Sequence, residues 1–205
     1  MITLLLVRHV TTEANEKHLW IGHMESEISM RGRCELEQLK KTLAHWKINK
    51  CFVSPSKRAV ETLEVGLSTQ ANRGEIGCEV VEALREIHFG KFEGKDFNWV
   101  KRHEPEEMHK MIKEKNAYCY PEGESLITAH QRIAQWLEGF LNNYKEGTYL
   151  ICAHGGTLRS ILSELLVHNE SLHWHFKIDT ASLTVVTLED GFAVIEALNK
   201  RGNSV

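Results

Sequence analysis

Two histidines stand at the ends of apolar stretches of this sequence, beside residues suited to binding an anion. Residues 4–7 are apolar and lead directly into Arg8 and His9, and residues 149–153 lead in the same way into His154. Arginine stays charged at working pH, and a neutral imidazole can act as a nucleophile. A lone histidine is more often structural, but two at the same end of two apolar segments indicate a site that holds and attacks an anionic group.

Two further features support this interpretation. Arg58 lies about one turn into a predicted helix that follows the short apolar segment 51–53. Gly155 and Gly156 follow the second histidine at the start of another predicted helix, and a helix N-terminus favours anions. Alone, Arg58 is typical of a solvated helix face and Gly-Gly of a turn. Together with the histidines they predict an anion site built from several segments.

The elements that must position these residues are short strands alternating with helices. Short continuous apolar runs are typical of strands buried on both faces of a parallel sheet, and ligands of such sheets lie beyond the carboxyl ends of the strands. The alternation predicts an α/β fold. Residues 181–188 and 192–197 flank Asp190-Gly191 and predict a terminal hairpin that supplies an antiparallel edge. Ser29 is the predicted N-cap of an early helix.

Length and composition limit the possible classes. We expect one domain over residues 1–205, with a helical insertion at about 95–125 lying over the carboxyl edge of the sheet and a continuous helix over about 96–115. The net charge of −3 gives no support to nucleic-acid binding. No run approaches membrane-spanning length. Five cysteines without a C-x-x-C pair predict reduced, mostly buried thiols in a cytoplasmic protein.

Several motifs occur in an order that resembles the histidine phosphatase superfamily, the phosphoglycerate mutase-like proteins. They are residues 7–9, Asn15, residues 54–62, residues 84–86 with Phe89-Gly90 and Glu93-Gly94, and residues 153–156. The resemblance covers nearly the whole chain. It implies a three-layer αβα sandwich around a mostly parallel sheet with an antiparallel edge.

The resemblance also implies a phosphohistidine mechanism. The implied roles are His9 as nucleophile, Glu86 as proton donor to the leaving oxygen, Arg8, Arg58 and His154 as the catalytic phosphate pocket, and Asn15 and Gly155 as further phosphate contacts. The residues suit these roles, because phosphoryl transfer needs positioning and charge stabilisation. The histidine must be neutral at the attacking nitrogen, so its other nitrogen should donate to a backbone carbonyl. A carboxyl group is a suitable general acid for the leaving oxygen.

Metal binding is the main rival explanation for the twelve histidines. His173 and His175 are two residues apart, and His103 and His109 lie in the predicted insertion. None has a cysteine or carboxylate at a known ligand spacing. We therefore expect no metal and no other cofactor.

One position departs from the family pattern, which usually has glycine after the catalytic histidine. Val10 stands there, and we expect it to narrow the pocket or shift the turn. A phospho-ligand binding protein without turnover is the alternative that Val10 supports.

The short insertion favours a phosphatase over a phosphoglycerate mutase, because water can reach a more open pocket. The chain resembles α-ribazole phosphatases of cobalamin nucleotide-loop assembly, and α-ribazole-5′-phosphate is the predicted substrate. A broad small-molecule or sugar phosphatase is the alternative. Trp99, Tyr118 and Tyr120 are candidates to stack on a ring. The expected partner is a small phosphorylated metabolite, with no nucleic acid and no membrane. The oligomeric state stays open, a homodimer being one option.

Overall fold

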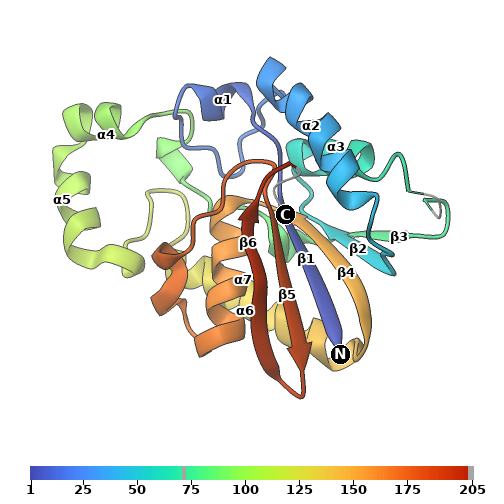
Figure 1. Ribbon diagram of the computed structural model, residues 1–205. Helices are drawn as coiled ribbons and strands as arrows, with labels where there is room; N and C mark the ends of the chain where they lie inside the picture. The colour runs from blue at the N-terminus through green and yellow to red at the C-terminus, as the bar shows by residue number, and fades with distance from the viewer. Residues whose placement is uncertain (71–72, 203–205) are drawn as a thin grey trace.

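A six-stranded mixed sheet forms the centre of the described part of the chain, residues 1–70 and 73–202 of a computed structural model (Figure 1). Residues 71–72 and 203–205 of the predicted domain lie outside this part. The strands are β1 (Ile2–Arg8), β2 (Lys50–Val53), β3 (Gly77–Val80), β4 (Gly147–Ala153), β5 (Leu183–Glu189) and β6 (Phe192–Lys200). Their order is β3-β2-β4-β1-β5-β6.

The strands from β3 to β1 run parallel, and β5 and β6 form the predicted antiparallel hairpin at one edge. β1 and β4 are neighbours in register, with Arg8 opposite Ala153. Their last residues therefore emerge side by side at one end of the sheet. The predicted site required these two strands to be neighbours, and they are.

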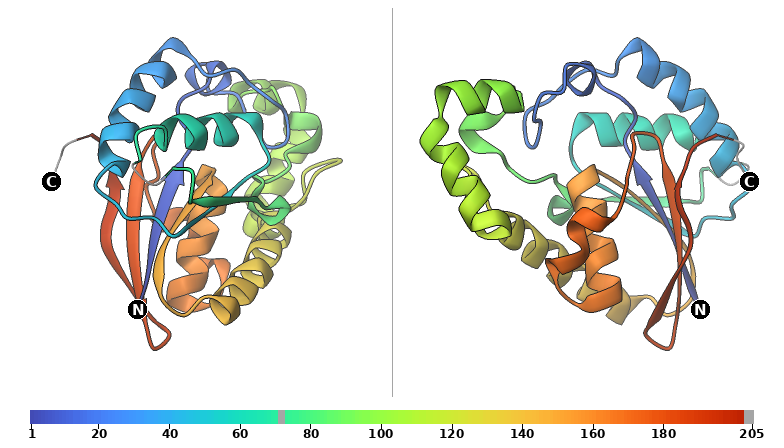
Figure 2. Two further views of the ribbon diagram at one scale, coloured as in Figure 1. Left: turned by 90° about the vertical axis from the view of Figure 1, so that its right-hand side faces the viewer. Right: turned by 60° about the vertical axis from the view of Figure 1, so that its left-hand side comes forward.

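Helices cover both faces of the sheet, as the views in Figure 2 show. The helices are α1 (Glu13–Glu16), α2 (Met30–Leu43), α3 (Lys57–Gly66), α4 (Phe97–His103), α5 (Pro105–Glu114), α6 (Leu126–Asn143) and α7 (Gly155–Val167). In β1, Leu4 and Leu6 pack with α6 and α7, whereas Leu5 and Val7 pack with α2 and α3. The alternation explains why this strand is apolar throughout. The predicted αβα architecture is confirmed.

The insertion differs from the predicted single helix. It contains two short helices, α4 and α5, because Pro105 lacks a backbone N–H and begins a new helix at its first position. Asp96 caps α4 by accepting a hydrogen bond from the backbone N–H of Trp99. Both helices lie toward the carboxyl end of β1, far from the N-terminus (Figure 1).

Two smaller expectations have different outcomes. Ser29 caps α2 as predicted, accepting a hydrogen bond from the Gly32 N–H. All five cysteines are free, but Cys34, Cys78 and Cys119 are exposed, so the prediction of mostly buried thiols was wrong.

Candidate active site

His9 directly follows β1 and is held as a neutral imidazole. Its backbone N–H donates to the carbonyl oxygen of Ala153 at 3.0 Å. Its Nδ1 lies 2.7 Å from the carbonyl oxygen of Val10. A carbonyl only accepts, so Nδ1 carries the proton and Nε2 keeps a lone pair. Burial, followed by the nearby Arg58 and Arg8 charges, holds the pKa of His9 well below its usual value. The predicted backbone acceptor is therefore present.

His154 directly follows β4, and its ring centroid lies 5.1 Å from that of His9. Its Nε2 is 2.7 Å from the Ser54 hydroxyl, at the end of β2. Burial and the Arg58 charge hold the pKa of His154 well below its usual value, so this ring is also neutral. The other ring nitrogen, Nδ1, is buried and has no partner among the described residues.

Two arginines, Arg58 buried and Arg8 half-buried, bring positive charge to the pair of histidines. Arg8 ends β1 and donates to the carbonyl oxygen of Ile178 at 2.6 Å. Arg58, in the first turn of α3, donates to the carbonyl oxygens of Met24 at 3.0 Å and Gly22 at 2.8 Å. In both arginines Nε is buried and has no partner in the described part of the chain. A buried unpaired donor costs about 1–3 kcal/mol, so these groups are well suited to an oxyanion.

The loop that holds Arg58 is itself fixed by Glu93. The Glu93 carboxylate accepts hydrogen bonds from the backbone N–H groups of His23, at 2.8 Å, and Met24. It also accepts from the N–H of Phe89 at 3.3 Å. Glu93 therefore positions the loop that in turn orients the guanidinium of Arg58.

The Glu86 carboxylate lies against the N-terminus of α7, a helix to which Glu86 itself does not belong, and it faces the same site. Its carboxylate accepts hydrogen bonds from the backbone N–H groups of Ile87 at 3.0 Å, Gly156 at 2.9 Å and Thr157 at 3.2 Å. A Cβ at Gly156 would lie 2.4 Å from a Glu86 oxygen, so this close approach requires glycine. The helix N–H groups that the sequence assigned to an anionic ligand thus hold Glu86 instead.

The remaining predicted phosphate contacts lie beside Arg8. A Cβ built on Gly155 would lie 3.3 Å from the Arg8 guanidinium, so the first residue of α7 packs directly against that group. The Asn15 oxygen accepts from the backbone N–H and hydroxyl of Thr12, which caps α1. Asn15 borders a separate shallow cavity that Arg8 also lines. The structure therefore groups Asn15 with Arg8 only.

Val10 does not line the pocket, so the expected narrowing was wrong, whereas the alternative, a shifted turn, stays a prediction. Its side chain is fully buried in a small cluster with Ile28 and Leu36, under α2. Its N–H donates to the Thr62 hydroxyl at 3.1 Å. The valine side chain points away from the histidine pair and has a packing role.

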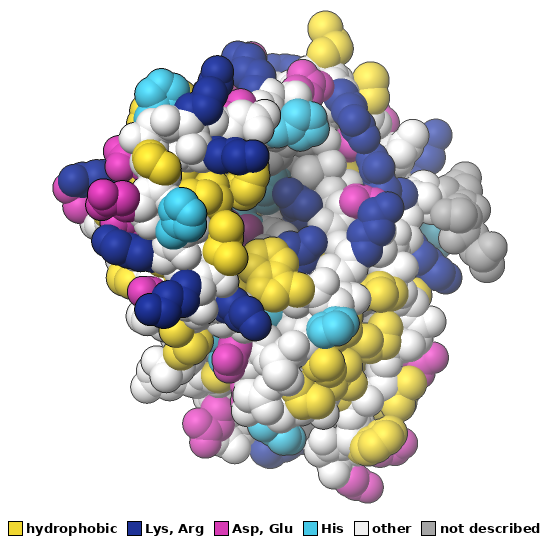
Figure 3. Space-filling model, turned by 90° about the vertical axis from the view of Figure 1, so that its left-hand side faces the viewer, with side chains coloured by type: hydrophobic (Ala, Val, Ile, Leu, Met, Phe, Trp, Pro, Cys, Tyr) yellow, Lys and Arg dark blue, Asp and Glu magenta, His cyan; other side chains and the backbone are white. Residues whose placement is uncertain are grey.

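A pocket of about 520 Å³ extends outward from this centre. Arg8, Glu86, Gly155 and Gly156 are among its lining residues, whereas His9, Arg58 and His154 are not. Figure 3 shows a hollowed face of the molecule in which basic side chains lie deep, beside a hydrophobic wall. Five of the twelve other described lining residues have large aromatic side chains: Trp20, Phe89, Tyr118, Tyr120 and Trp174.

Sequence reasoning identified only part of this aromatic wall. Tyr118 and Tyr120 line the pocket as predicted, but Trp99 does not; its ring stacks on His103 within the insertion, 4.6 Å between centroids. Trp20 and Trp174 were missed, because nothing in the sequence places their separate segments beside β1. Burial, followed by the Glu86 charge, raises the pKa of Tyr120 to about 12, so its phenol is neutral.

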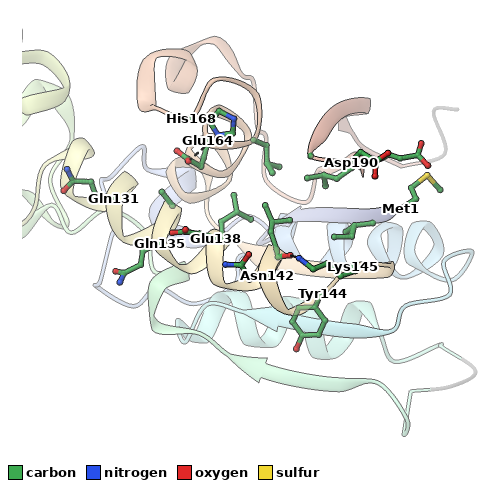
Figure 4. Close-up of a pocket in the computed structure, with 18 residues that line it drawn as sticks. Met1, Gln131, Gln135, Glu138, Asn142, Tyr144, Lys145, Glu164, His168 and Asp190 are labelled. Carbon is green, nitrogen blue, oxygen red and sulfur yellow. Dashed lines mark hydrogen bonds and ion pairs between the residues drawn. The ribbon is translucent and has the colours of Figure 1, made fainter.

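A larger cavity of about 950 Å³ lies elsewhere, between α6, α7 and the β5–β6 turn (Figure 4). Glu138 and Asn142 from α6, Glu164 and His168 from α7, and Asp190 from the turn lie around it. No predicted catalytic residue borders this cavity. Of these two cavities, the smaller is therefore the one that predicted catalytic residues border.

The described residues contain no cluster of three or more histidine, cysteine or carboxylate side chains suited to a metal ion. His173 is buried against Ser160, while His103 and His109 contact backbone carbonyls of their own helices. No described helix is long and apolar enough to cross a membrane.

Comparison with known proteins agrees with this geometry. The model of the histidine phosphatase superfamily (branch 1) matches residues 4–201. The chain belongs to the histidine phosphatase superfamily. It is a phosphoric monoester hydrolase by that membership and by its phosphatase relatives.

Three relatives cover nearly the full chain. Phosphoserine phosphatase 1 of Hydrogenobacter thermophilus is 28% identical over 200 residues, 97% of this chain and 92% of the relative. The adenosylcobalamin/alpha-ribazole phosphatase of Salmonella typhimurium is 25% identical over 205 residues, covering 97% and 96%. The crystal structure of the alpha-ribazole phosphatase from Shigella flexneri superimposes with a TM-score of 0.87 at 21% identity, covering 99% and 98%, and shows the same fold.

Proposed function

We propose that this histidine phosphatase hydrolyses α-ribazole-5′-phosphate through a phosphohistidine on His9, without a metal. The observation that carries the proposal is the arrangement around His9. Its Nδ1 is fixed as a donor, and three buried polar atoms without partners belong to its neighbours Arg8, Arg58 and His154. They supply donors for phosphate oxygens in place of a metal ion.

In the first step, the Nε2 lone pair of His9 attacks phosphorus, and the bond from phosphorus to the ester oxygen breaks. Arg8 and Arg58 stabilise the charge on the equatorial oxygens. The Glu86 carboxyl group is the proposed acid of this step: it gives a proton to the leaving oxygen, which departs as an alcohol. Burial, followed by the charge of ionised Glu86, raises the pKa of Tyr120 to about 12, so a neutral phenol flanks this carboxyl group.

In the second step, water attacks the phosphorus of the phosphohistidine and the phosphorus–nitrogen bond breaks. Glu86, now ionised, takes the proton from the attacking water. Inorganic phosphate leaves, and His9 returns to the neutral form that its Val10 hydrogen bond fixes.

The aromatic pocket supports α-ribazole phosphate as the substrate, because its leaving group carries a planar bicyclic base. Tyr120 contacts Phe89 and Tyr118 edge to face, with centroids 5.0 and 5.2 Å apart, and such rings accept a planar group. This substrate would place the enzyme in cobalamin nucleotide-loop assembly in the cytoplasm.

Phosphoserine is the second candidate, supported by the relative with 28% identity and by two cations at the pocket, Lys115 and Arg159. These cations suit its carboxylate. Its ammonium group is less well served, since Glu86 is the single carboxylate among the described lining residues.

The test is release of phosphate from α-ribazole phosphate and phosphoserine in EDTA, together with acid-labile phosphate on the protein. We expect hydrolysis of both, with a higher kcat/KM for α-ribazole phosphate, and no turnover or phosphoprotein for His9→Ala. Loss of activity in EDTA would refute the metal-free mechanism. A higher kcat/KM for phosphoserine would replace the named substrate. Exchange between phosphoglycerates that is faster than hydrolysis would indicate a mutase. Release of phosphate from neither substrate would indicate a binding protein.

A further inference from the structure

Trp174 is an exposed tryptophan at the mouth of the aromatic pocket. It belongs to η4 (Glu170–His175), the 3₁₀ segment that follows α7, and 65% of its surface is exposed. Burying an indole stabilises a fold strongly, so a tryptophan left in solvent at a pocket entrance offers unused contact area. Because Trp174 lines the pocket, we expect a bound ligand to contact the exposed part of its indole.

Three contacts hold the indole despite its exposure. Its Nε1–H donates to the Asn116 side-chain oxygen at 3.0 Å. The Arg159 guanidinium carbon lies 5.6 Å from the ring centroid, a cation–π distance. The ring also meets His173 edge to face, with centroids 4.8 Å apart. The orientation is thus set before a ligand arrives, which lowers the entropic cost of binding.

The Asn116 hydrogen bond joins two parts of the molecule. Asn116 lies in η3 (Lys115–Ala117), at the end of the helical insertion, whereas Trp174 follows the core helix α7. Both residues line the pocket. Their contact therefore joins the insertion to the core at this pocket.

The side chain buried beneath the Trp174 indole is uncharged. His173 is fully buried beneath Trp174, with Nδ1 3.1 Å from the Ser160 hydroxyl. Burial, followed by the Arg159 charge, lowers its pKa to about 3, so the ring is neutral at working pH. Above this neutral base, the Trp174 indole and the Tyr118 and Tyr120 rings of the same lining offer a surface for a planar aromatic group, beside the cations Lys115 and Arg159.

We propose that Trp174 is a specificity-determining residue that stacks on a planar aromatic leaving group, with Asn116 fixing its indole across the pocket mouth. The proposal rests on the proposed function only in that the leaving group enters this pocket. It concerns ring-bearing phosphomonoesters as a class and does not depend on α-ribazole phosphate being the physiological substrate.

The test compares 1-naphthyl phosphate, with a bicyclic leaving group, and glycerol phosphate, with a small one. We expect Trp174→Ala to lower kcat/KM for the naphthyl ester about 10-fold and to leave glycerol phosphate within about twofold. Asn116→Ala should give a smaller loss, of about threefold, on the naphthyl ester alone. Phe192→Ala is the matched control, because Phe192 is 74% exposed on β6, away from the pocket lining, and both esters should be unaffected.

Equal losses on both esters, or no loss on either, would overturn the proposal. If wild type hydrolyses the aryl ester but not α-ribazole phosphate, only the named substrate fails. If neither ester is turned over, the proposed function fails, and calorimetric binding of 1-naphthyl phosphate to His9→Ala, with and without Trp174→Ala, then decides. An affinity that the second substitution does not change refutes the stacking role.

Discussion

Three buried histidines with lowered pKa values make the stability of this protein sensitive to mild acid. His9 and His154 form the proposed catalytic pair, and His173 is buried beside Trp174 of the pocket lining. Each has a lower pKa in the folded chain than the usual value of 6.5. Below that pH the unfolded chain binds more protons than the folded one, so the free energy of unfolding falls as the pH falls. The stabilising contribution is complete above pH 6.5.

The magnitude follows from the size of the window. One pH unit is worth about 1.36 kcal/mol for each proton taken up on unfolding. The unfolded imidazole is half protonated at pH 6.5 and almost fully protonated at pH 5.0, so over this window each histidine removes about 1.7 kcal/mol of stability, and the three together about 5 kcal/mol. Domains have only about 5–15 kcal/mol in total. Carboxylates titrate mainly below this window, so they contribute little to the change.

The assay is urea unfolding at several pH values between 6.5 and 5.0. We expect the slope of the unfolding free energy against pH to approach at least three protons in wild type, since the pKa of His23 is also lowered, first by burial, and to be about one proton smaller in His173→Gln, which removes one titrating ring outside the proposed catalytic pair. His109→Gln, on the exposed surface of α5, is the matched control and should keep the wild-type slope. Equal slopes in wild type and His173→Gln would refute the reasoning.

Other predictions concern residues around the catalytic centre. Val10→Gly should lower the free energy of unfolding by roughly 2–4 kcal/mol, measured in urea, without raising kcat, because Val10 packs in a buried cluster; a faster enzyme would contradict this. Glu93→Gln should lower kcat/KM about 10-fold, since one carboxylate oxygen is lost from the loop that orients Arg58, while Glu122→Gln on the exposed surface serves as control. Gly156→Ala should lower kcat about 100-fold by displacing Glu86, with phosphate affinity retained; Gly155→Ala should instead weaken phosphate binding through Arg8. Identical kinetic profiles for the two glycine variants would exclude this separation.

Much of the fold was predictable because its signals are local. The apolar run of residues 4–7 is legible as a buried strand, since alternate residues meet helices on opposite faces of the sheet. The Ser29 cap and the Asp190-Gly191 turn are equally local. The break in the insertion is also written in the sequence, at Pro105, and a stricter use of proline would have found it.

Strand order predicted the parts of the site that lie at the ends of strands. Arg8, His9 and His154 follow from strand order, whereas the direction of the Val10 side chain depends on packing under α2. The Asn116–Trp174 contact joins residues 58 positions apart, and no periodicity reports it. The hydrogen bonds from the start of α7 to Glu86 are likewise visible only in three dimensions.

The central placement of β1 and β4 has a consequence for local opening. Edges and insertions of a fold exchange their amide hydrogens more readily than its innermost strands, which open only with the whole domain. β3 and β6 are the outer strands, and the catalytic histidines follow two inner ones. Amide hydrogens beside His9 and His154 should therefore be among the slowest to exchange with deuterium, and those of α4 and α5 among the faster. The phosphate-binding centre then keeps its shape while the part that meets the leaving group fluctuates.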